Sequence, residues 1–313
     1  MYYIGIDFGG TNISAGIVDE DMKILAKRTT PTKAERHYSE IIKDMVDICK
    51  ELVDDIRTDF DSVFSIGIGC PGMVDAESGN VIYVNNLKFD NVNIKEEFAK
   101  YLNTPVFINN DANCAALGES VAGACKWYKN SITITLGTGI GGGIIIDGKI
   151  YNGSFFGSGE IGHMVIEHNG RECTCGRKGC FEAYASTSAL TKITKEIVAE
   201  HNESEIYTEV NGNIENINTK ILFKCADNGD TVAKDIIEKY IDYLAAGITN
   251  LVNIFQPKVI AIGGGISAQG DKILKPLTKL VERDVYGGVL KTKLVIATLG
   301  NDAGIVGASM LGK

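Results

Sequence analysis

One internal repeat restricts the possible fold of this chain more than any other feature. The stretch IGIDFGGTNISAGIVD, residues 4–19, aligns without a gap with ITITLGTGIGGGIIID, residues 132–147. Each stretch has an alternating strand, a glycine-rich turn, a second apolar strand and an aspartate. This is the pattern of a β-hairpin whose turn leaves room for a ligand to approach the backbone. The repeat predicts two related halves.

Further strands and helices alternate along the chain. Apolar runs predict short strands over residues 62–70, 105–110, 258–267 and 293–298. Helical spacing or helix-forming composition predicts helices over residues 38–57, 112–123, 231–255 and 302–313. In the helix over 231–255 we expect six residues to face inward: Ile237, Ile241, Leu244, Ile248, Leu251 and Phe255. The alternation predicts an α/β fold with partly parallel sheets.

Composition excludes several classes of function. A chain of 313 residues can bury a sizeable core and favours two domains. The formal net charge of -9, without a local basic patch, disfavours nucleic acid as a partner. The first residues have no pattern of a targeting peptide, and no uncharged apolar stretch is long enough for a membrane helix. We therefore expect a cytoplasmic protein.

The glycine turns look like nucleotide motifs of two kinds. Residues 67–72 and 137–142 match G-x-G-x-x-G, but neither is followed directly by the helix that a dinucleotide site requires, and no Walker A loop is present. A single hairpin turn is most simply an ordinary tight turn. Its recurrence in both halves, with hydroxyls at Thr11 and Thr138, favours phosphate binding by backbone N–H groups. Asp7, at the end of the first strand, is placed to hold Mg²⁺ through water.

Polar side chains suited to a neutral polyhydroxyl ligand follow in three stretches. Asn110 and Asp111 come at a predicted strand-to-helix junction, Glu160 and His163 lie in GSGEIGH, and Glu182 follows the cysteines. Carboxylates and amides without a run of cations suit the hydroxyls of a sugar. Transfer of a phosphoryl group to a hydroxyl needs a nearby general base, and we assign Asp111 to that role.

Three cysteines form the cluster CTCGRKGC. Cys173, Cys175 and Cys180 have the spacing C-x-C-x₄-C, with His163 ten residues upstream and His168 nearer in sequence. Three thiolates and one imidazole make a closed tetrahedral zinc site of the structural type. Redox chemistry is disfavoured because there is no C-x-x-C pair. A disulfide between the first two cysteines would close a strained small ring in a reducing compartment.

Five ordered motifs resemble the ROK family (repressors, open reading frames, sugar kinases) over essentially the whole chain. They are IGIDFGGTN, INNDANCAALGE, TLGTGIGGGIIIDGKIYNGSFFGSGEIGH, CTCGRKGCFE and AIGGGIS. The resemblance implies two ribonuclease-H-like domains of the actin-like ATPase kind around a central cleft. The smaller domain would contain residues 1–115 and 300–313, and the larger one residues 116–299 with the zinc-binding loop.

The resemblance also implies an activity and a set of site residues. The activity is ATP-dependent phosphorylation of a hexose, first of all glucose, with Mg²⁺ and a structural Zn²⁺ held by His163 and the three cysteines. The residues implied to contact the sugar are Asn110, Asp111, Glu160, His163 and Glu182. The residues implied on the nucleotide and metal side are Asp7, Gly9, Gly10, Thr11, Asn12, Gly137, Thr138, Gly139, Gly263, Gly264 and Gly265.

Several alternatives stay open at this point. The stretch NNLKFDNVNI, residues 85–94, resembles glucose kinases of the family, but N-acetylmannosamine, N-acetylglucosamine and fructose kinases share the catalytic motifs. A repressor of the family would carry a DNA-binding region before the first strand, which here starts at Tyr2. An actin-like or Hsp70-like nucleotide switch would not use the sugar-type carboxylates. The family implies a homodimer or tetramer, and polyphosphate is an alternative donor to ATP.

Overall fold

The chain forms two compact units. The computed structural model describes residues 1–84, 87–89 and 91–313. Unit 1 consists of Met1–Thr133, Gly142–Gly159 and Ala297–Lys313, and unit 2 of Ile134–Gly141 and Glu160–Ile296. The domain boundaries at residues 115 and 300 stay a prediction.

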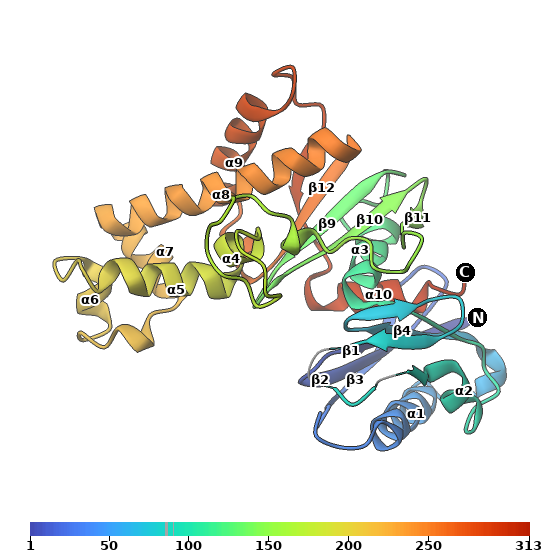
Figure 1. Cartoon of the computed structure of the whole chain (residues 1–313). Helices are drawn as coiled ribbons and strands as arrows, with labels where there is room; N and C mark the ends of the chain where they lie inside the picture. The colour runs from blue at the N-terminus through green and yellow to red at the C-terminus, as the bar shows by residue number, and fades with distance from the viewer. Residues whose placement is uncertain (85–86, 90) are drawn as a thin grey trace. The chain divides into compact units, whose positions relative to one another are not determined.

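Two five-stranded sheets have the same strand order, β3-β2-β1-β4-β8 and β11-β10-β9-β12-β13 (Figure 1). The first consists of β1 (Tyr2–Phe8), β2 (Asn12–Val18), β3 (Ile24–Pro31), β4 (Val63–Cys70) and β8 (Val106–Asn110). The second consists of β9 (Ser131–Leu136), β10 (Ile140–Ile146), β11 (Lys149–Ile150), β12 (Val259–Gly264) and β13 (Lys293–Ile296). In the first sheet β1 pairs antiparallel with β2 and parallel with β4, and in the second β12 and β13 are parallel. The shared order confirms the prediction of two related halves.

Ten α-helices lie in the described part of the chain. In unit 1 they are α1 (Tyr38–Asp55), α2 (Ile94–Ala99), α3 (Asp111–Val121) and α10 (Ala303–Ser309). In unit 2 they are α4 (Glu182–Ala185), α5 (Thr187–Val198), α6 (Glu205–Glu209), α7 (Thr219–Asn228), α8 (Thr231–Phe255) and α9 (Asp271–Asp284). Among these residues no helix combines the length and the apolarity needed to cross a membrane. A small sheet in unit 1 contains β5 (Met73–Asp75), β6 (Asn80–Tyr83) and β7 (Val92–Asn93).

Helix α8 has the bounds predicted from its periodicity, but one inward residue was predicted wrongly. Four of the six are buried as expected and Ile237 is half-buried, whereas Phe255 is 36% exposed. The four buried residues are Ile241, Leu244, Ile248 and Leu251. Phe255 is the last residue of the helix, and Gln256 after it has a left-handed backbone that turns the chain away. The apolar periodicity of the sequence continues to the last residue of the helix, but the neighbouring elements do not cover the helix that far.

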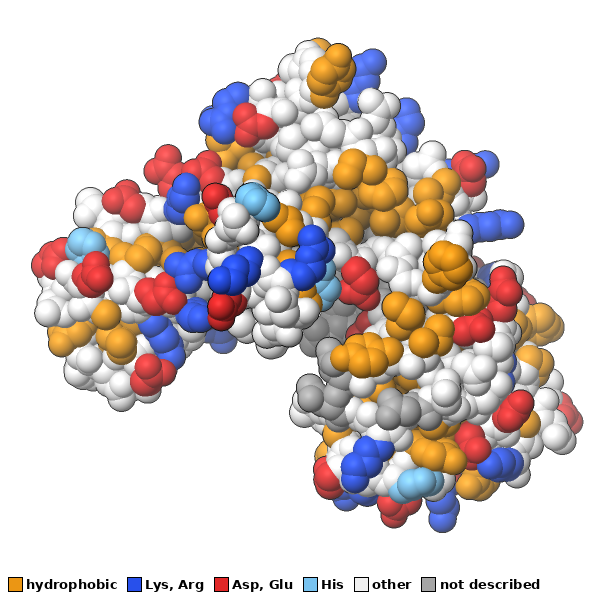
Figure 2. All heavy atoms as spheres, in the orientation of Figure 1, with side chains coloured by type: hydrophobic (Ala, Val, Ile, Leu, Met, Phe, Trp, Pro, Cys, Tyr) orange, Lys and Arg blue, Asp and Glu red, His pale blue; other side chains and the backbone are white. Residues whose placement is uncertain are grey.

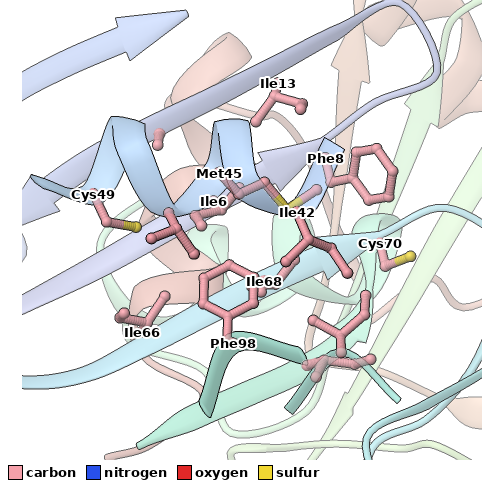
Figure 3. Close-up of a cluster of buried hydrophobic side chains, with 14 of the residues drawn as sticks. Ile6, Phe8, Ile13, Ile42, Met45, Cys49, Ile66, Ile68, Cys70 and Phe98 are labelled. Atoms are coloured by element: carbon pink, nitrogen blue, oxygen red, sulfur yellow. The ribbon is translucent and has the colours of Figure 1, made fainter. Parts of the chain in front are cut away.

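The core of unit 1 follows from the two-residue period of its strands. Ile6 on β1 and Ile68 on β4 point to the face of the sheet that α1 covers, where they meet Ile42 and Met45 (Figure 3). All four side chains are fully buried. Successive residues of a strand point to opposite faces of its sheet. The residues that directly precede Ile6 and Ile68 in the sequence must therefore face the other helices, α3 and α10.

Those alternate positions are glycines, and they let α10 approach the strands closely. A Cβ at Gly67 would lie 1.7 Å from the carbonyl oxygen of Ala308, and one at Gly5 would lie 1.9 Å from that of Ile305. On the helix side, a Cβ at Gly307 would lie 1.7 Å from the carbonyl oxygen of Cys114 on α3. The glycine at position 67, which matched a dinucleotide motif, therefore serves helix packing.

Replacing Gly307 with alanine tests this packing. Alanine favours a helix over glycine by about 1 kcal/mol, so propensity alone predicts a small gain in stability. The clash with Cys114 reverses the sign, and we expect a loss of about 1–3 kcal/mol or more in the free energy of unfolding, as overpacked cores show. Urea denaturation followed by circular dichroism measures it. Gly10→Ala is the control, because a Cβ there meets no atom within 4 Å; a Gly307→Ala protein as stable as this control would contradict the prediction.

In unit 2 one aromatic side chain anchors the cysteine-containing loop to the longest helix. Phe181 follows Cys180 directly and is fully buried. A Cβ at Gly247 on α8 would lie 2.5 Å from the Phe181 ring, so glycine leaves the space that the ring fills. The end of the loop is thereby fixed to α8.

Candidate active site and zinc site

Asp111 lies where β8 ends and α3 begins, at the predicted junction. The side chain of Asn110 caps the helix, because its Oδ1 accepts hydrogen bonds from the backbone N–H groups of Ala112 (2.9 Å) and Asn113 (3.1 Å). Its Nδ2 donates to the carbonyl oxygen of Gly72 at 3.0 Å. The Asp111 carboxylate is half-buried, and its Oδ1 accepts from Ala112 N at 2.8 Å. Asn110 therefore holds the backbone at Asp111. This structural role was not predicted, because the sequence indicated only a contact between Asn110 and the sugar.

A chain of amides supports this junction from below. Asn113 Nδ2 donates to Asn109 Oδ1 at 3.0 Å, and Asn109 Nδ2 donates to Asn152 Oδ1 at 3.1 Å. Asn109 and Asn113 are buried, and Asn152 lies in the loop after β11. The amides connect the segment of Asp111 to the loop that leads to Glu160. These supporting roles were not predicted from the sequence, although the polar run INNDAN could have indicated those of Asn109 and Asn113.

The first glycine turn, between β1 and β2, is held by a threonine from β3's end. Gly9 N donates to Asn12 O at 2.9 Å within the turn. Thr32 is buried, its Oγ1 donates to Gly9 O at 2.6 Å, and its N–H donates to Thr11 O at 2.8 Å. The turn is fixed, while Gly10 and Thr11 are exposed and accessible to a ligand.

The second glycine turn, between β9 and β10, is held in the same way. Thr187 Oγ1 donates to Leu136 O at 3.3 Å, and Thr187 N donates to Gly137 O at 2.9 Å. Thr138 is exposed at the tip. No local pattern in the sequence predicted Thr32 or Thr187, because each is distant in sequence from the turn that it holds.

Glu182 connects this second turn to the cysteine loop. Its Oε2 accepts from Ile140 N at 2.9 Å, and its Oε1 lies 3.4 Å from Thr174 Oγ1. A Cβ at Gly139 would lie 2.3 Å from Oε2, so glycine is required there for the carboxylate to reach the turn. One carboxylate therefore bridges a glycine turn and the loop predicted to hold zinc.

The third glycine motif lies beside the second. Gly263 and Gly264 end β12, and Gly264 has a φ of +90° with no room for a Cβ, which would lie 2.1 Å from Leu136 O. Gly265 lines a cavity of about 550 Å³ together with Gly137 and Thr138. The structure therefore brings two of the predicted nucleotide motifs to one cavity of unit 2.

Asp7 lies on β1 against the beginning of α10. Burial raises the pKa of its carboxyl group, and the positive charge of Lys27 opposes this rise. A Cβ at Gly304 would lie 2.9 Å from the Asp7 Cγ, so glycine makes the space that the carboxylate occupies. A partly desolvated carboxylate in a glycine cradle fits the oxygen ligand that Mg²⁺ prefers.

The cysteine cluster has the geometry of a tetrahedral metal site. Candidate ligand atoms of His163, Cys173, Cys175 and Cys180 all lie within 4.8 Å of one another. Cys175 Sγ and Cys180 Sγ are 3.7 Å apart, as are Cys173 Sγ and His163 Nδ1. Zn–S bonds of about 2.3 Å at tetrahedral angles place two sulfurs about 3.8 Å apart. The donor set therefore fits zinc, with His163 and not His168 completing the cluster.

The predicted sugar contacts are distributed over both units. Asn110 and Asp111 belong to unit 1, and Glu160, His163 and Glu182 belong to unit 2. Glu160 is exposed and directly precedes the 3₁₀ turn Ile161–His163, where His163 N donates to its carbonyl oxygen at 3.1 Å. Their contacts with a sugar stay predictions. Of the stretch 85–94, used above to favour glucose, residues 85, 86 and 90 lie outside the described residues.

Comparisons with known proteins cover the whole chain. A sequence profile described as the ROK family matches residues 3–313. The glucokinase of Thermotoga maritima is 37% identical over 310 residues, which is 98% of this chain and 96% of that enzyme. The xylose repressor of Caldicellulosiruptor bescii is 30% identical over 305 residues, which is 97% of this chain and 76% of the repressor. A ROK family glucokinase from Streptomyces griseus, solved with glucose and AMPPNP, is 33% identical, with a TM-score of 0.83 over 99% of both chains.

These similarities agree with the sheet order and the ordered motifs described above. The α/β fold is that of the actin-like ATPases. The chain belongs to the ROK family.

Proposed function

We propose that the protein is an ATP-dependent sugar kinase that converts glucose to glucose 6-phosphate. The observation that carries the proposal is similarity to glucokinases over nearly the full length, combined with a half-buried carboxylate at a strand-to-helix junction. Asp111 takes the proton of the sugar hydroxyl as that oxygen attacks the terminal phosphorus of ATP, and the bond from this phosphorus to the bridging oxygen breaks to release ADP. The side chains of Asn110, Asn109 and Asn113 hold the start of the helix from which this carboxylate projects.

The remaining site residues bind and orient the two substrates. Four side chains form hydrogen bonds with the sugar hydroxyls: Asn110, Glu160, His163 and Glu182. ATP is held by the glycine turns at Thr11 and Thr138 and by the third glycine motif, which ends at Gly265. Carboxylate oxygens suit vicinal hydroxyls, and backbone N–H groups suit phosphate oxygens. Binding both substrates in fixed orientation supplies much of the rate enhancement in such reactions.

Two metals belong to the proposal. Asp7 would hold Mg²⁺, which neutralises phosphate charge when it is bound. His163, Cys173, Cys175 and Cys180 would hold one structural Zn²⁺, as the fit of their ligand atoms supports. A homodimer or tetramer and a cytoplasmic location complete the proposal, and they rest on the family resemblance and on the sequence.

A sugar panel tests the proposed function. Release of ADP from Mg-ATP is measured with glucose, fructose, N-acetylmannosamine and N-acetylglucosamine, and again with polyphosphate in place of ATP. We expect the highest kcat/KM with glucose and ATP. A higher kcat/KM with an N-acetylated sugar would show that this sugar, and not glucose, is the preferred substrate. Absence of activity with every hexose would contradict the proposal that the protein is a sugar kinase.

A sugar-responsive repressor is the second candidate, because a xylose repressor is also similar to this chain. The net charge of -9 disfavours it, since DNA binding needs cations at the phosphate backbone. A shift of duplex DNA in gel electrophoresis at physiological salt, in response to sugar, would support this candidate instead.

A further inference from the structure

The cavity beside the second glycine turn has the lining of a polyanion site. Its volume is about 550 Å³. Hydroxyls, glycines and lysines line it, among them Gly137, Thr138, Ser188, Thr191, Lys192 and Lys195. No carboxylate among the described residues lines this cavity. Donors and cations without opposing anions suit phosphate groups.

The two lysines lie on the same face of α5, which the glycine turn fixes in place. Lys192 and Lys195 are three residues apart, and residues at this spacing are neighbours on a helix. Thr187, in the first turn of α5, donates both its N–H and its Oγ1–H to the glycine turn. The lysines are therefore held at a defined position relative to Thr138.

Lys192 and Lys195 differ in their ion pairs. Lys195 Nζ lies 2.7 Å from Glu215 Oε2, so its charge is already paired. Lys192 is exposed and forms no direct ion pair among the described residues, although its charge helps to lower the pKa of the Glu196 carboxyl group. Glu196, which also lies on α5, forms its ion pair with Arg171, and 2.7 Å separates Arg171 Nη2 from Glu196 Oε2. The charge of Lys192 is thus available to a ligand.

Lys192 also lines a second cavity, of about 360 Å³, that continues toward the proposed sugar carboxylate. Thr138, Ser188 and Lys192 line both cavities, and Glu182 and Thr174 line the second one only. Figure 2 shows several Lys and Arg side chains, with Asp and Glu side chains among them, over α4 and α5. Lys192 therefore contributes to the lining of both the cavity with Gly265 and the one with Glu182.

We propose that Lys192 binds the β- and γ-phosphate end of the phosphoryl donor and sets the preference for di- and triphosphates over a monophosphate. The inference rests on the proposed function and adds a residue that no motif in the sequence indicated. Lys195, paired with Glu215, contributes little to this binding.

Calorimetric titration of the Lys192→Met protein with AMPPNP, ADP, AMP and inorganic tripolyphosphate tests the proposal. Loss of a charge-assisted hydrogen bond should weaken AMPPNP, ADP and tripolyphosphate by roughly 10- to 100-fold. Binding of AMP should change less than about threefold, because a monophosphate does not reach the lysine. In steady state the KM for ATP should rise while the KM for glucose stays unchanged, and Lys192→Arg should recover most of the affinity.

Lys195→Met is the matched control, on the same helix face but ion-paired in the native protein. Unchanged AMPPNP affinity in Lys192→Met, or an equal loss for AMP and AMPPNP, would overturn the proposal. So would a larger loss in Lys195→Met than in Lys192→Met. If the native protein phosphorylates no hexose, the proposed function fails, and a loss of tripolyphosphate binding in Lys192→Met would still support the phosphate site.

Discussion

Replacing Asp111 with asparagine is expected to lower kcat by roughly 10²- to 10⁴-fold, the contribution typical of a general base. Asparagine has nearly the same shape, and its Oδ1 can still accept the hydrogen bond from Ala112 N that Asp111 accepts. It cannot take a proton from the sugar hydroxyl at neutral pH. We therefore expect glucose and AMPPNP to bind with nearly native affinity, measured by calorimetry, while turnover is lost.

A surface aspartate provides the control for this substitution. Asp147 is exposed and has a left-handed backbone with a φ of 51°, which asparagine adopts easily. Asp147→Asn should keep full activity. Turnover of the Asp111→Asn protein within tenfold of the native rate, with native folding by circular dichroism, would show that another group is the base.

Removal of zinc is expected to have the second large effect. Between Glu160 and Glu182 the described backbone has one 3₁₀ turn and two isolated bridges, at Val165–Cys180 and Glu172–Lys178, but no α-helix or longer strand. Backbone hydrogen bonds within the loop, such as Phe181 N to Met164 O at 2.8 Å, support it, and zinc would tie its four ligands together. Binding of structural zinc contributes on the order of 10 kcal/mol in small zinc-binding peptides. We expect a strong chelator, or Cys180→Ser, to weaken glucose affinity by at least about tenfold, about 1.4 kcal/mol, before the whole protein unfolds.

Metal content, glucose binding and thermal unfolding of the same samples separate the possible outcomes. His163→Ala should lose zinc, because its Nδ1 lies 3.7 Å from Cys173 Sγ, and His168→Ala should retain it as the control. Loss of zinc from His168→Ala but not from His163→Ala would contradict the ligand set. Metal-free protein that binds and phosphorylates glucose normally would show that the loop does not depend on the ion.

Local features of the fold were predictable because each depends on a short window of sequence. The repeated glycine turns predicted both hairpins, and the apolar period over 231–255 predicted α8 with its observed bounds. The cysteine spacing predicted a cluster that the structure assembles with His163. The strand-to-helix junction at Asp111 was predictable from a strand that ends in amides followed by an alanine-rich segment.

Features that depend on contacts between distant residues were not predictable. Gly67 matched a dinucleotide motif, and its packing against Ala308 appears only when the C-terminal helix is in place. Thr32 and Thr187 hold turns far from them in sequence, and Lys192 resembles any exposed lysine of an amphipathic helix until the cavity forms. Periodicity identifies which side chains face inward, but the partner on the other side is a property of the folded chain.

The close fit of α10 into unit 1 also constrains biosynthesis. Residues 297–313 are synthesised after all of unit 2, yet the glycines of β1 and β4, which are synthesised before it, are shaped to receive this helix. Unit 1 therefore cannot complete its core until α10 has left the ribosome, whereas all residues of unit 2 are available earlier. A nascent chain truncated before residue 303 would expose the glycine face of the first sheet, and such a fragment is the natural substrate for chaperones and proteases.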